Sequence, residues 1–220
     1  YIDLMSHNSI LIVGSIAMDT IETPVEKRSN MLGGSTTYSL VASGRQSEVS
    51  IVGIVGNDFP REGHSLYKSY ASDLSDLKIA EGKTFQWGGR YHENWDDRDT
   101  LFTELGVFSD FRPVLTESNK NRSHILLANI HPELQQSVIQ QNQNPNAIVV
   151  IDTMNLWIET TLPSLEKVLS ASRFPRKHIA IPSTCKRASL ISAFTNIRRA
   201  TTDSTISVYS HFRFYNEFLY

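Results

Sequence analysis

The stretch LGGSTTYSLVASGRQSEVSIVGIVG, Leu32–Gly56, predicts the fold class of this 220-residue chain. Two adjacent glycines, Gly33 and Gly34, precede Thr36–Ala42, where apolar residues recur at helical spacing. A polar turn separates that helix from Val49–Val55, a continuous apolar run that is typical of a strand buried on both faces. A helix that leads directly into a buried strand is typical of α/β proteins with a parallel sheet.

The same alternation of strands and helices extends in both directions. Upstream, the apolar run Ile10–Val13 predicts a strand before the first helix. Downstream, the hydrophobic pattern predicts helices over Glu62–Asp73, Pro132–Gln141 and Glu159–Ser170, and strands over Leu77–Ala80, His124–Asn129 and Ala147–Asp152. Proline suits the first position of a helix, which supports the start at Pro132. We therefore expect an α/β fold with parallel strands and flanking helices.

Two polar and aromatic segments interrupt this alternation, at about residues 20–32 and 83–108. In the second segment, aromatic and polar residues alternate through Phe85–Trp87 and Arg90–His92, which favours exposed strands. We expect the two segments to form a small antiparallel β lid beside the core. The aromatic residues of this lid suit either packing within the chain or a homodimer that forms through the lid.

Composition places the chain among globular proteins, because 40% of its residues are hydrophobic and 20% are charged. The single cysteine, Cys185, excludes an internal disulfide, and no signal-peptide pattern follows Tyr1. The longest apolar runs are far shorter than the roughly 20 residues that cross a bilayer. These features predict a cytoplasmic protein without a membrane segment.

Charge and composition change after residue 170. Residues 1–170 carry 13 basic and 21 acidic side chains, whereas residues 171–220 carry 8 and 2. All 11 glycines lie at or before Gly106, so the last 50 residues have none for turns and helix ends. The favoured interpretation is an atypical basic tail, helical or irregular. Contact with nucleic acid or an acidic partner is less favoured, and a tail foreign to the native reading of the gene is the third alternative.

Several familiar motifs are absent from the sequence. It contains no G-x-x-x-x-G-K-[ST], G-x-G-x-x-G, G-x-S-x-G or H-E-x-x-H pattern and no paired cysteines. P-loop, dinucleotide-binding, hydrolase-elbow and zinc sites therefore lack the residues that would form them. The acidic cluster between His92 and Asp99 has no regular ligand spacing, so a solvated loop is favoured over a cation site.

Residues that suit a polyhydroxy ligand lie near the ends of the first predicted strands. Asp19 follows Ile10–Val13 by a few residues, and a carboxylate accepts hydrogen bonds from two adjacent hydroxyls. Gly33 and Gly34 allow close backbone approach to a ligand. They also precede a helix whose first amides, with Ser35–Thr37, are expected to donate to an oxygen-rich ligand. A plain turn is the alternative for each motif.

Three motifs, in this order and spacing, resemble the N-terminal half of the ribokinase-like sugar kinases of the phosphofructokinase-B family: GSIAMD at Gly14–Asp19, LGGSTTY at Leu32–Tyr38 and VGIVGNDFP at Val52–Pro60. Three further stretches resemble one bacterial subgroup of carbohydrate kinases: Gly82–Leu101, Leu126–Gln135 and Val149–Glu159. The resemblance implies a ribokinase-like αβα Rossmann-like core with a small β lid. It also implies ATP-dependent phosphorylation of a sugar, nucleoside or related hydroxyl compound, with ATP and Mg²⁺ as cofactors.

The resemblance also implies which residues hold the substrate. Asp19 resembles the family's substrate-hydroxyl aspartate, and Gly33 and Gly34 resemble its substrate-contacting glycine pair. Asn129 lies where a strand-end residue of the family faces the sugar. Ribose itself is not implied, because the chain departs from the asparagine, lysine and asparagine contacts of ribokinase at Ala17, Ser35 and Tyr38.

The family's general base lies in a C-terminal Gly-Ala-Gly-Asp motif, whose helix also forms the anion hole, but this chain has no glycine after Gly106. We therefore assign no catalytic residue. Residues 8–170 are expected to be the N-terminal part of a carbohydrate kinase domain, truncated and inactive, with residues 171–220 outside the resemblance. A non-catalytic sugar-binding or regulatory module is the alternative. Loss of the strands beyond Asp152 would leave apolar side chains of Ile148–Ile151 exposed.

Overall fold

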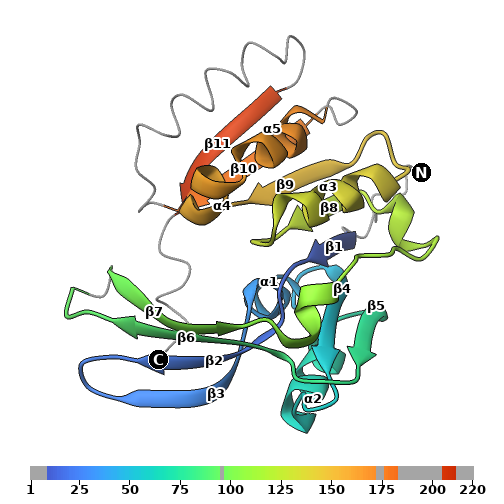
Figure 1. The fold of residues 1–220 in the computed structure, drawn as a ribbon. Helices are drawn as coiled ribbons and strands as arrows, with labels where there is room; N and C mark the ends of the chain where they lie inside the picture. The colour runs from blue at the N-terminus through green and yellow to red at the C-terminus, as the bar shows by residue number, and fades with distance from the viewer. Residues whose placement is uncertain (1–8, 95–96, 172–175, 183–204, 212–220) are drawn as a thin grey trace.

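The computed structural model describes residues 9–94, 97–171, 176–182 and 205–211 and arranges their strands in two sheets (Figure 1). The larger sheet contains β1 (Ser9–Val13), β4 (Glu48–Gly56), β5 (Asp73–Ala80), β8 (His124–Leu127), β9 (Ile148–Asp152), β10 (Arg176–Pro182) and β11 (Thr205–His211). The smaller sheet, the lid, contains β2 (Ala17–Glu22), β3 (Lys27–Gly33), β6 (Phe85–Tyr91) and β7 (Arg98–Glu104). The helices are α1 (Ser35–Ser43), α2 (Arg61–Tyr70), α3 (Pro132–Gln141), α4 (Asn155–Thr160) and α5 (Leu162–Ser170), with 3-10 turns at Gly106–Asp110 and Asn119–Asn121.

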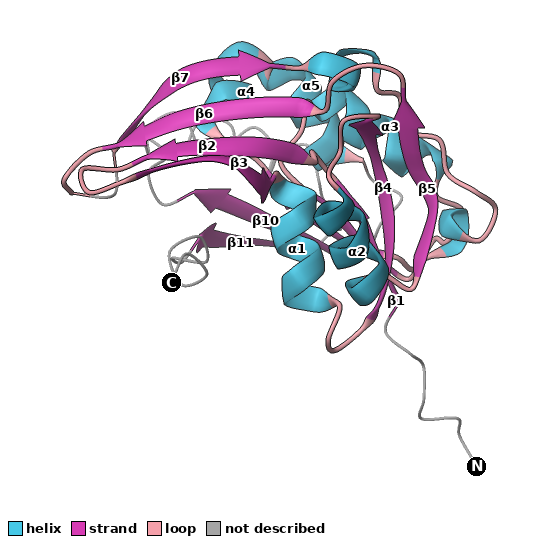
Figure 2. Cartoon of the chain, turned by 90° about the horizontal axis from the view of Figure 1, so that it is seen from below, coloured by secondary structure: helices cyan, strands magenta, loops and turns pink. Residues whose placement is uncertain are grey.

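The larger sheet has the strand order β11-β10-β9-β8-β1-β4-β5, and all its neighbouring strands pair in parallel. Successive side chains of a strand point to opposite faces, and β1 supplies both of them. Its Leu11 packs on the face covered by α3 and α5, whereas its Ile12 packs on the face that Leu40 of α1 and Tyr67 of α2 cover (Figure 2). The predicted α/β fold with helices on both faces of a parallel sheet is confirmed.

Helix ends account for two differences from the predicted elements. The helix predicted over Glu62–Asp73 ends at Tyr70, because Ser72 already joins the sheet through a 2.9 Å hydrogen bond from its backbone N–H to the Val49 carbonyl. The helix predicted over Glu159–Ser170 is two helices, α4 and α5. Proline has no N–H and excludes the helical carbonyl four residues before it, so Pro163 starts a new helix rather than continuing α4.

The lid consists of the two interrupting segments, as expected, in the strand order β3-β2-β6-β7. The prediction of a wholly antiparallel lid is wrong at its centre, because β2 and β6 pair in parallel from Ala17 opposite Phe85 onward. Both strands leave the larger sheet in the same direction, one after β1 and the other after β5 (Figure 1). Asp58 fixes the chain where it passes from β5 to β6, because the Thr84 backbone N–H and hydroxyl each donate a hydrogen bond to its carboxylate at 2.7 Å.

The region after residue 170 contributes two strands to the larger sheet. The expectation of a helical or irregular tail is wrong for β10 and β11, and the rest of that region lies outside the described residues. Because β10 pairs with β9, Ile148–Ile151 does not form the edge of the sheet, and Val149 and Ile151 are fully buried. Alternating β-branched residues in both new strands suit this pairing without glycine.

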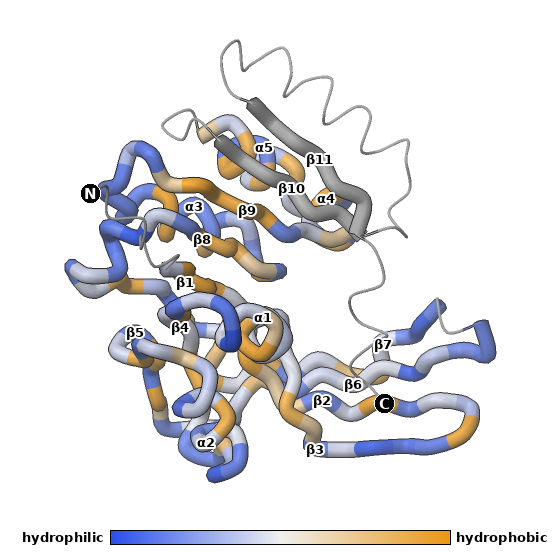
Figure 3. The backbone as a smooth tube through the Cα atoms, turned by 180° about the vertical axis from the view of Figure 1, so that it is seen from behind, coloured by the Kyte–Doolittle hydropathy of each residue, from blue (hydrophilic) through white to orange (hydrophobic). Residues whose placement is uncertain are grey.

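Hydropathy follows the same division between core and lid (Figure 3). The tube is apolar along β8 and β9 and largely hydrophilic along β7 and the outer part of β3. In the described part of the chain, no helix is long and apolar enough to cross a membrane.

Candidate functional site

Asp19 lies on β2 where the lid leaves the core, and its carboxylate is almost fully buried, with 8% of the residue exposed. Gly33 pairs with Ala17 on the neighbouring strand, and a Cβ atom at Gly33 would overlap the Asp19 carboxylate. The Gly34 backbone N–H donates a hydrogen bond to that carboxylate. The structure therefore brings together three residues that the sequence predicted for one site.

Gly34 is the turn between β3 and α1, and its φ of 86° is a conformation that residues with a side chain rarely adopt. A Cβ atom there would lie 2.5 Å from the Ser15 carbonyl oxygen and 2.8 Å from the Ala17 nitrogen. Both neighbours are backbone atoms, which cannot turn away. Glycine at this position is what allows β3 to return against the Asp19 strand.

The first amides of α1 are not available to a ligand, so that prediction is wrong. The Thr36 backbone N–H donates to the Ser15 carbonyl at 2.9 Å, and the Ser35 backbone N–H donates to the Ser15 hydroxyl at 3.2 Å. The Thr37 backbone N–H donates to the Gly34 carbonyl at 3.1 Å. These bonds satisfy the helix N-terminus within the chain and fasten α1 to the loop after β1.

The surroundings of Asp19 raise its pKa to about 6, because burial disfavours the charged carboxylate more than the Gly34 N–H and the Arg98 charge favour it. The charge of Asp19 also acts on Tyr38 of α1. Burial first, and then the charge of Asp19, raises the pKa of Tyr38 to about 12. Near neutral pH the pair therefore combines an ionised acceptor with a phenol that keeps its proton, which suits hydroxyl groups of a ligand.

Asn129 lies two residues beyond the end of β8, outside the strand predicted over His124–Asn129. Its side-chain oxygen accepts a 2.8 Å hydrogen bond from the Trp157 indole, and its Nδ2 donates to the Met154 sulfur at 3.1 Å. Among the described residues, no hydrogen bond links Asn129 to Asp19, Gly33 or Gly34. Its amide is held instead by the segment after β9.

Asp152, the last residue of β9, is a second acid, half-buried, that the sequence analysis gave no role. Burial raises its pKa to about 7, although the backbone N–H groups of Thr153 and Asn129 donate to it. Gln135 of α3 fixes this region, since its Nε2 donates to the carbonyls of Asp152 and Ala128 at 2.9 and 3.0 Å. The sequence did contain a signal for Asp152 as a candidate site residue, because it is an acid at the carboxyl end of a predicted parallel strand. Ligands of α/β proteins bind at the carboxyl ends of such strands.

The strand order β9-β8-β1 places both acids at the same edge of the larger sheet. The ends of β8 and β1 touch there: the Ala128 backbone N–H donates to the Val13 carbonyl at 2.8 Å, and a Cβ atom at Gly14 would lie 2.9 Å from the Ala128 Cβ. This end of the sheet is also where the lid begins, since β1 leads into β2 there.

Comparisons with known proteins agree with this fold. No family model matches the sequence, and no curated protein does. Among solved structures, ribokinase from Giardia lamblia superposes with a TM-score of 0.70 at 14% identity, over 93% of this chain and 70% of that one. Ribokinase from Cryptococcus neoformans in complex with ADP gives 0.65 at 15%, over 91% and 71%. The ribokinase-family nucleoside kinase of Methanocaldococcus jannaschii gives 0.64 at 15%, over 92% and 70%.

The chain therefore has the ribokinase-like fold, and the expected core and lid are confirmed. It spans about 70% of the length of those structures. Within the described residues, no group of three or more histidine, cysteine, aspartate or glutamate side chains is arranged to hold a metal ion. In the acidic loop, His92 Nε2 lies 3.1 Å from the Asp99 carboxylate, and both side chains are exposed.

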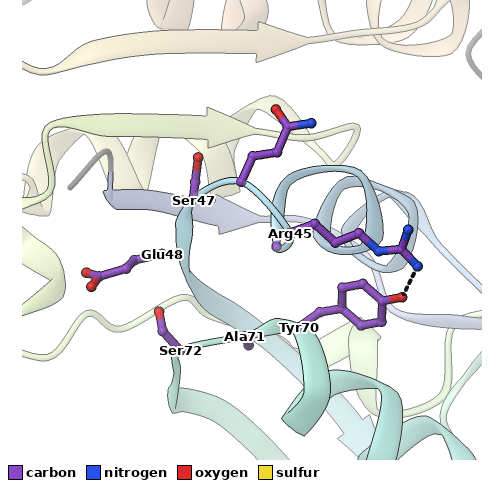
Figure 4. A pocket seen from close by; sticks show the side chains of 8 residues that line it. Arg45, Ser47, Glu48, Tyr70, Ala71 and Ser72 are labelled. Atoms are coloured by element: carbon purple, nitrogen blue, oxygen red, sulfur yellow. Dashed lines mark hydrogen bonds between the residues drawn. The ribbon is translucent and has the colours of Figure 1, made fainter.

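A surface hollow lies at the other end of β4, between the ends of α1 and α2 (Figure 4). Arg45 donates to the Tyr70 hydroxyl at 3.1 Å beside it, and Glu48 and Ser72 lie on its other side. Glu48 begins β4, so this hollow is at the amino edge of the sheet, opposite Asp19 and Asp152. Arg45 and Glu48 are the charged residues among those that line this hollow, and neither forms an ion pair with Asp19 or Asp152.

Proposed function

We propose that this chain is the substrate-holding part of a ribokinase-fold kinase and that it binds a sugar, nucleoside or related polyhydroxy compound between the lid and the core. The buried Asp19 carboxylate beside the Gly33–Gly34 turn is the observation that carries the proposal. We include Asn129, which follows the end of β8, among the residues that would contact the compound. The solved structures with this fold are ribokinases and nucleoside kinases, one of them with inosine bound.

Asp19 would hold two adjacent hydroxyls of the substrate. An ionised carboxylate forms charge-assisted hydrogen bonds, which are shorter and stronger than neutral ones. Since Gly33 has no side chain, the carboxylate packs directly against the β3 backbone, in the space that a Cβ atom would fill. The Tyr38 hydroxyl nearby retains its proton near neutral pH.

ATP with Mg²⁺ would supply the phosphoryl group in a kinase of this fold, and a ribokinase neighbour contains ADP. The described residues offer no metal site, so no step of the proposal runs through a metal held by this chain. Phosphoryl transfer also needs a base for the substrate hydroxyl and donors for the transferring group. The sequence has no Gly-Ala-Gly-Asp motif to provide them. We therefore expect the 220-residue chain to bind substrate without turnover.

Calorimetric titration with pentoses, hexoses and nucleosides tests binding. Asp19→Asn should weaken the tightest interaction by about 1.5 to 3 kcal/mol, the range for a hydrogen bond to a charged group. Asp110→Asn is the matched control, because it makes the same chemical change at an exposed aspartate, at the end of the 3-10 turn Gly106–Asp110. Equal affinity of the Asp19→Asn variant and the unmodified chain would remove Asp19 from the site.

A non-catalytic sugar-binding or regulatory module is the second candidate, and the missing base motif favours it. Release of ADP from Mg-ATP in the presence of the bound compound separates the two. Substrate binding without ADP release is expected for this chain alone under either candidate. Restoration of turnover by a separate polypeptide that carries Gly-Ala-Gly-Asp would favour the kinase, and failure of such complementation would favour the module.

We also propose that the lid mediates a homodimer. Exposed apolar side chains on the lid support this, notably Val25 in the β2–β3 turn at 80% exposure and Leu101 on β7 at 39%. Sedimentation should show a dimer at high micromolar concentration that Leu101→Glu dissociates. A monomer at that concentration would overturn the lid dimer and leave the substrate site unaffected.

A further inference from the structure

One face of the lid contains more than Asp19. Asp19 pairs in register with Trp87, and Ile21 pairs with Gly89. Paired residues of neighbouring strands point to the same face of a sheet, so Trp87 lies on the face that carries the carboxylate. Tyr91, four residues after Trp87 on β6, lies on that face too, and its charge contributes with that of Asp19 to the raised pKa of Tyr38. This face is therefore directed toward α1.

The indole of Trp87 is held flat against its own strand. A Cβ atom at Gly89 would overlap the indole ring, so the ring occupies the space above Gly89 that a side chain would fill. The Arg98 guanidinium, from β7, lies over this ring at 5.3 Å from the ring centroid. Such stacking fixes the plane of a guanidinium without using its N–H donors.

Arg98 differs from the other cations of the lid. Arg90 and Lys27 both pair with Glu22, and Arg28 pairs with Glu26. In the part of the lid that the structure describes, no carboxylate lies within ion-pair distance of Arg98. Its charge nevertheless acts on Asp19, whose pKa it lowers. The guanidinium is thus close enough to influence the site while its donors stay free of described acceptors.

We propose that Trp87 and Arg98 form an anion-reading subsite beside Asp19, and that the compound held there carries a carboxylate or phosphate group. This rests on the proposed substrate site and specifies the class of its substrate. A guanidinium presents parallel N–H donors that match the two oxygens of a carboxylate or phosphate. The indole holds this guanidinium in place beside the site. A sugar acid or sugar phosphate would therefore bind both Asp19 and Arg98, and a neutral sugar only Asp19.

The test is calorimetric titration of the full chain with three compounds that differ at one carbon: glucose, glucuronate and glucose 6-phosphate. Ribose and ribose 5-phosphate form a second matched pair. The anionic member should bind at least about tenfold more tightly than the neutral one, the effect of one charge-assisted hydrogen bond. Preference for glucuronate would assign a carboxylate, and preference for glucose 6-phosphate or ribose 5-phosphate would assign a phosphate.

Arg98→Gln should abolish this preference when both chains are titrated at pH 8, well above the pKa of about 6 of Asp19, so that loss of the Arg98 charge does not protonate the carboxylate. Arg28→Gln, which removes an exposed lid arginine paired with Glu26, is the matched control and should keep the preference. If Arg98 acted only by tuning Asp19, Arg98→Gln would weaken neutral and anionic compounds equally, which would overturn the subsite. Trp87→Phe keeps an aromatic face and should retain most of the preference, whereas Trp87→Leu should reduce it.

The two proposals fail in different ways. Equal binding of neutral and anionic compounds, still sensitive to Asp19→Asn, would overturn the anion-reading subsite alone. Absence of binding by all five compounds and by the wider panel of sugars and nucleosides would overturn both.

Discussion

The lid and the core hold the polar residues of the candidate site differently. On the lid side, Asp19 accepts from the Gly34 N–H and faces a position without a side chain. On the side formed by β8 and β9, the Asn129 side-chain oxygen accepts from Trp157 and its nitrogen donates to Met154. The lid side therefore has an acceptor ready for a ligand, while the other side is fastened to its own chain. Glycine contributes to this difference, because the absence of a Cβ atom at Gly33 lets the Asp19 carboxylate pack directly against β3.

The largest expected effect comes from a side chain at the glycine turn between β3 and α1. Gly34→Ala should destabilise the chain by about 3 kcal/mol, because the positive φ is strained for alanine and the new Cβ meets backbone atoms. Gly53→Ala is the comparison variant, since its Cβ would meet side-chain atoms, Ile16 Cδ1 at 2.8 Å and Leu77 Cδ1 at 3.7 Å, rather than backbone, and its φ is not positive. Urea unfolding of both variants measures the difference. Equal stability of the two variants would show that the turn has no such constraint.

Asp152 and Asp19 should make stability depend on pH over different ranges. A carboxyl whose pKa is raised on folding stabilises the folded state below its unfolded pKa of 3.8, and that contribution is lost as pH rises through the folded pKa. The free energy of unfolding should therefore decrease with rising pH, up to about pH 6 through Asp19 and up to about pH 7 through Asp152. Asp152→Asn should therefore remove the part of the decrease between pH 6 and 7, of the order of 1 kcal/mol.

Urea unfolding at half-unit steps from pH 4 to 8 measures this decrease in the unmodified chain, Asp152→Asn and Asp19→Asn. Asp110→Asn, at an exposed site, should leave the curve unchanged. A decrease between pH 6 and 7 that persists in Asp152→Asn would show that another group titrates there.

The smallest expected effect concerns Asn129. If its amide faces the substrate, Asn129→Ala should weaken binding by about 0.5 to 1.5 kcal/mol, the range for a neutral hydrogen bond and less than for Asp19→Asn. Trp157→Phe is the control, because it breaks the same 2.8 Å hydrogen bond while it keeps the Asn129 amide. Equal losses in both variants would mean that Asn129 only supports the loop and does not contact substrate.

Elements with a strong local pattern could be predicted from the sequence. The strand β4 and the helix α3 follow from a continuous apolar run and from a proline start, and Asp19 with Gly33 and Gly34 stood out by spacing. The strands β10 and β11 were missed, because absence of glycine says little about segments that pair inside a sheet.

Other parts of the site depend on contacts between distant residues. The amides of α1 were assigned to a ligand, since no local pattern shows that Ser15 returns to satisfy them. The Trp87 ring packs over Gly89 on the face of the lid that carries Asp19, and this arrangement depends on the register between β2 and β6. The burial that raises the pKa of Asp152 requires α3 and the neighbouring strands. None of these follows from sequence spacing alone.

The affinity of the tightest-binding polyhydroxy compound for the unmodified chain and for Asp19→Asn, measured by calorimetry from pH 5 to 8, tests the central claim most directly. Hydroxyl groups bind the ionised carboxylate, so affinity for the unmodified chain should rise as pH increases through about 6, the pKa of Asp19. Asp19→Asn should bind weakly and without that rise. Equal affinities for both chains, or a rise that persists in the variant, would contradict the assignment of Asp19 as the residue that holds the substrate.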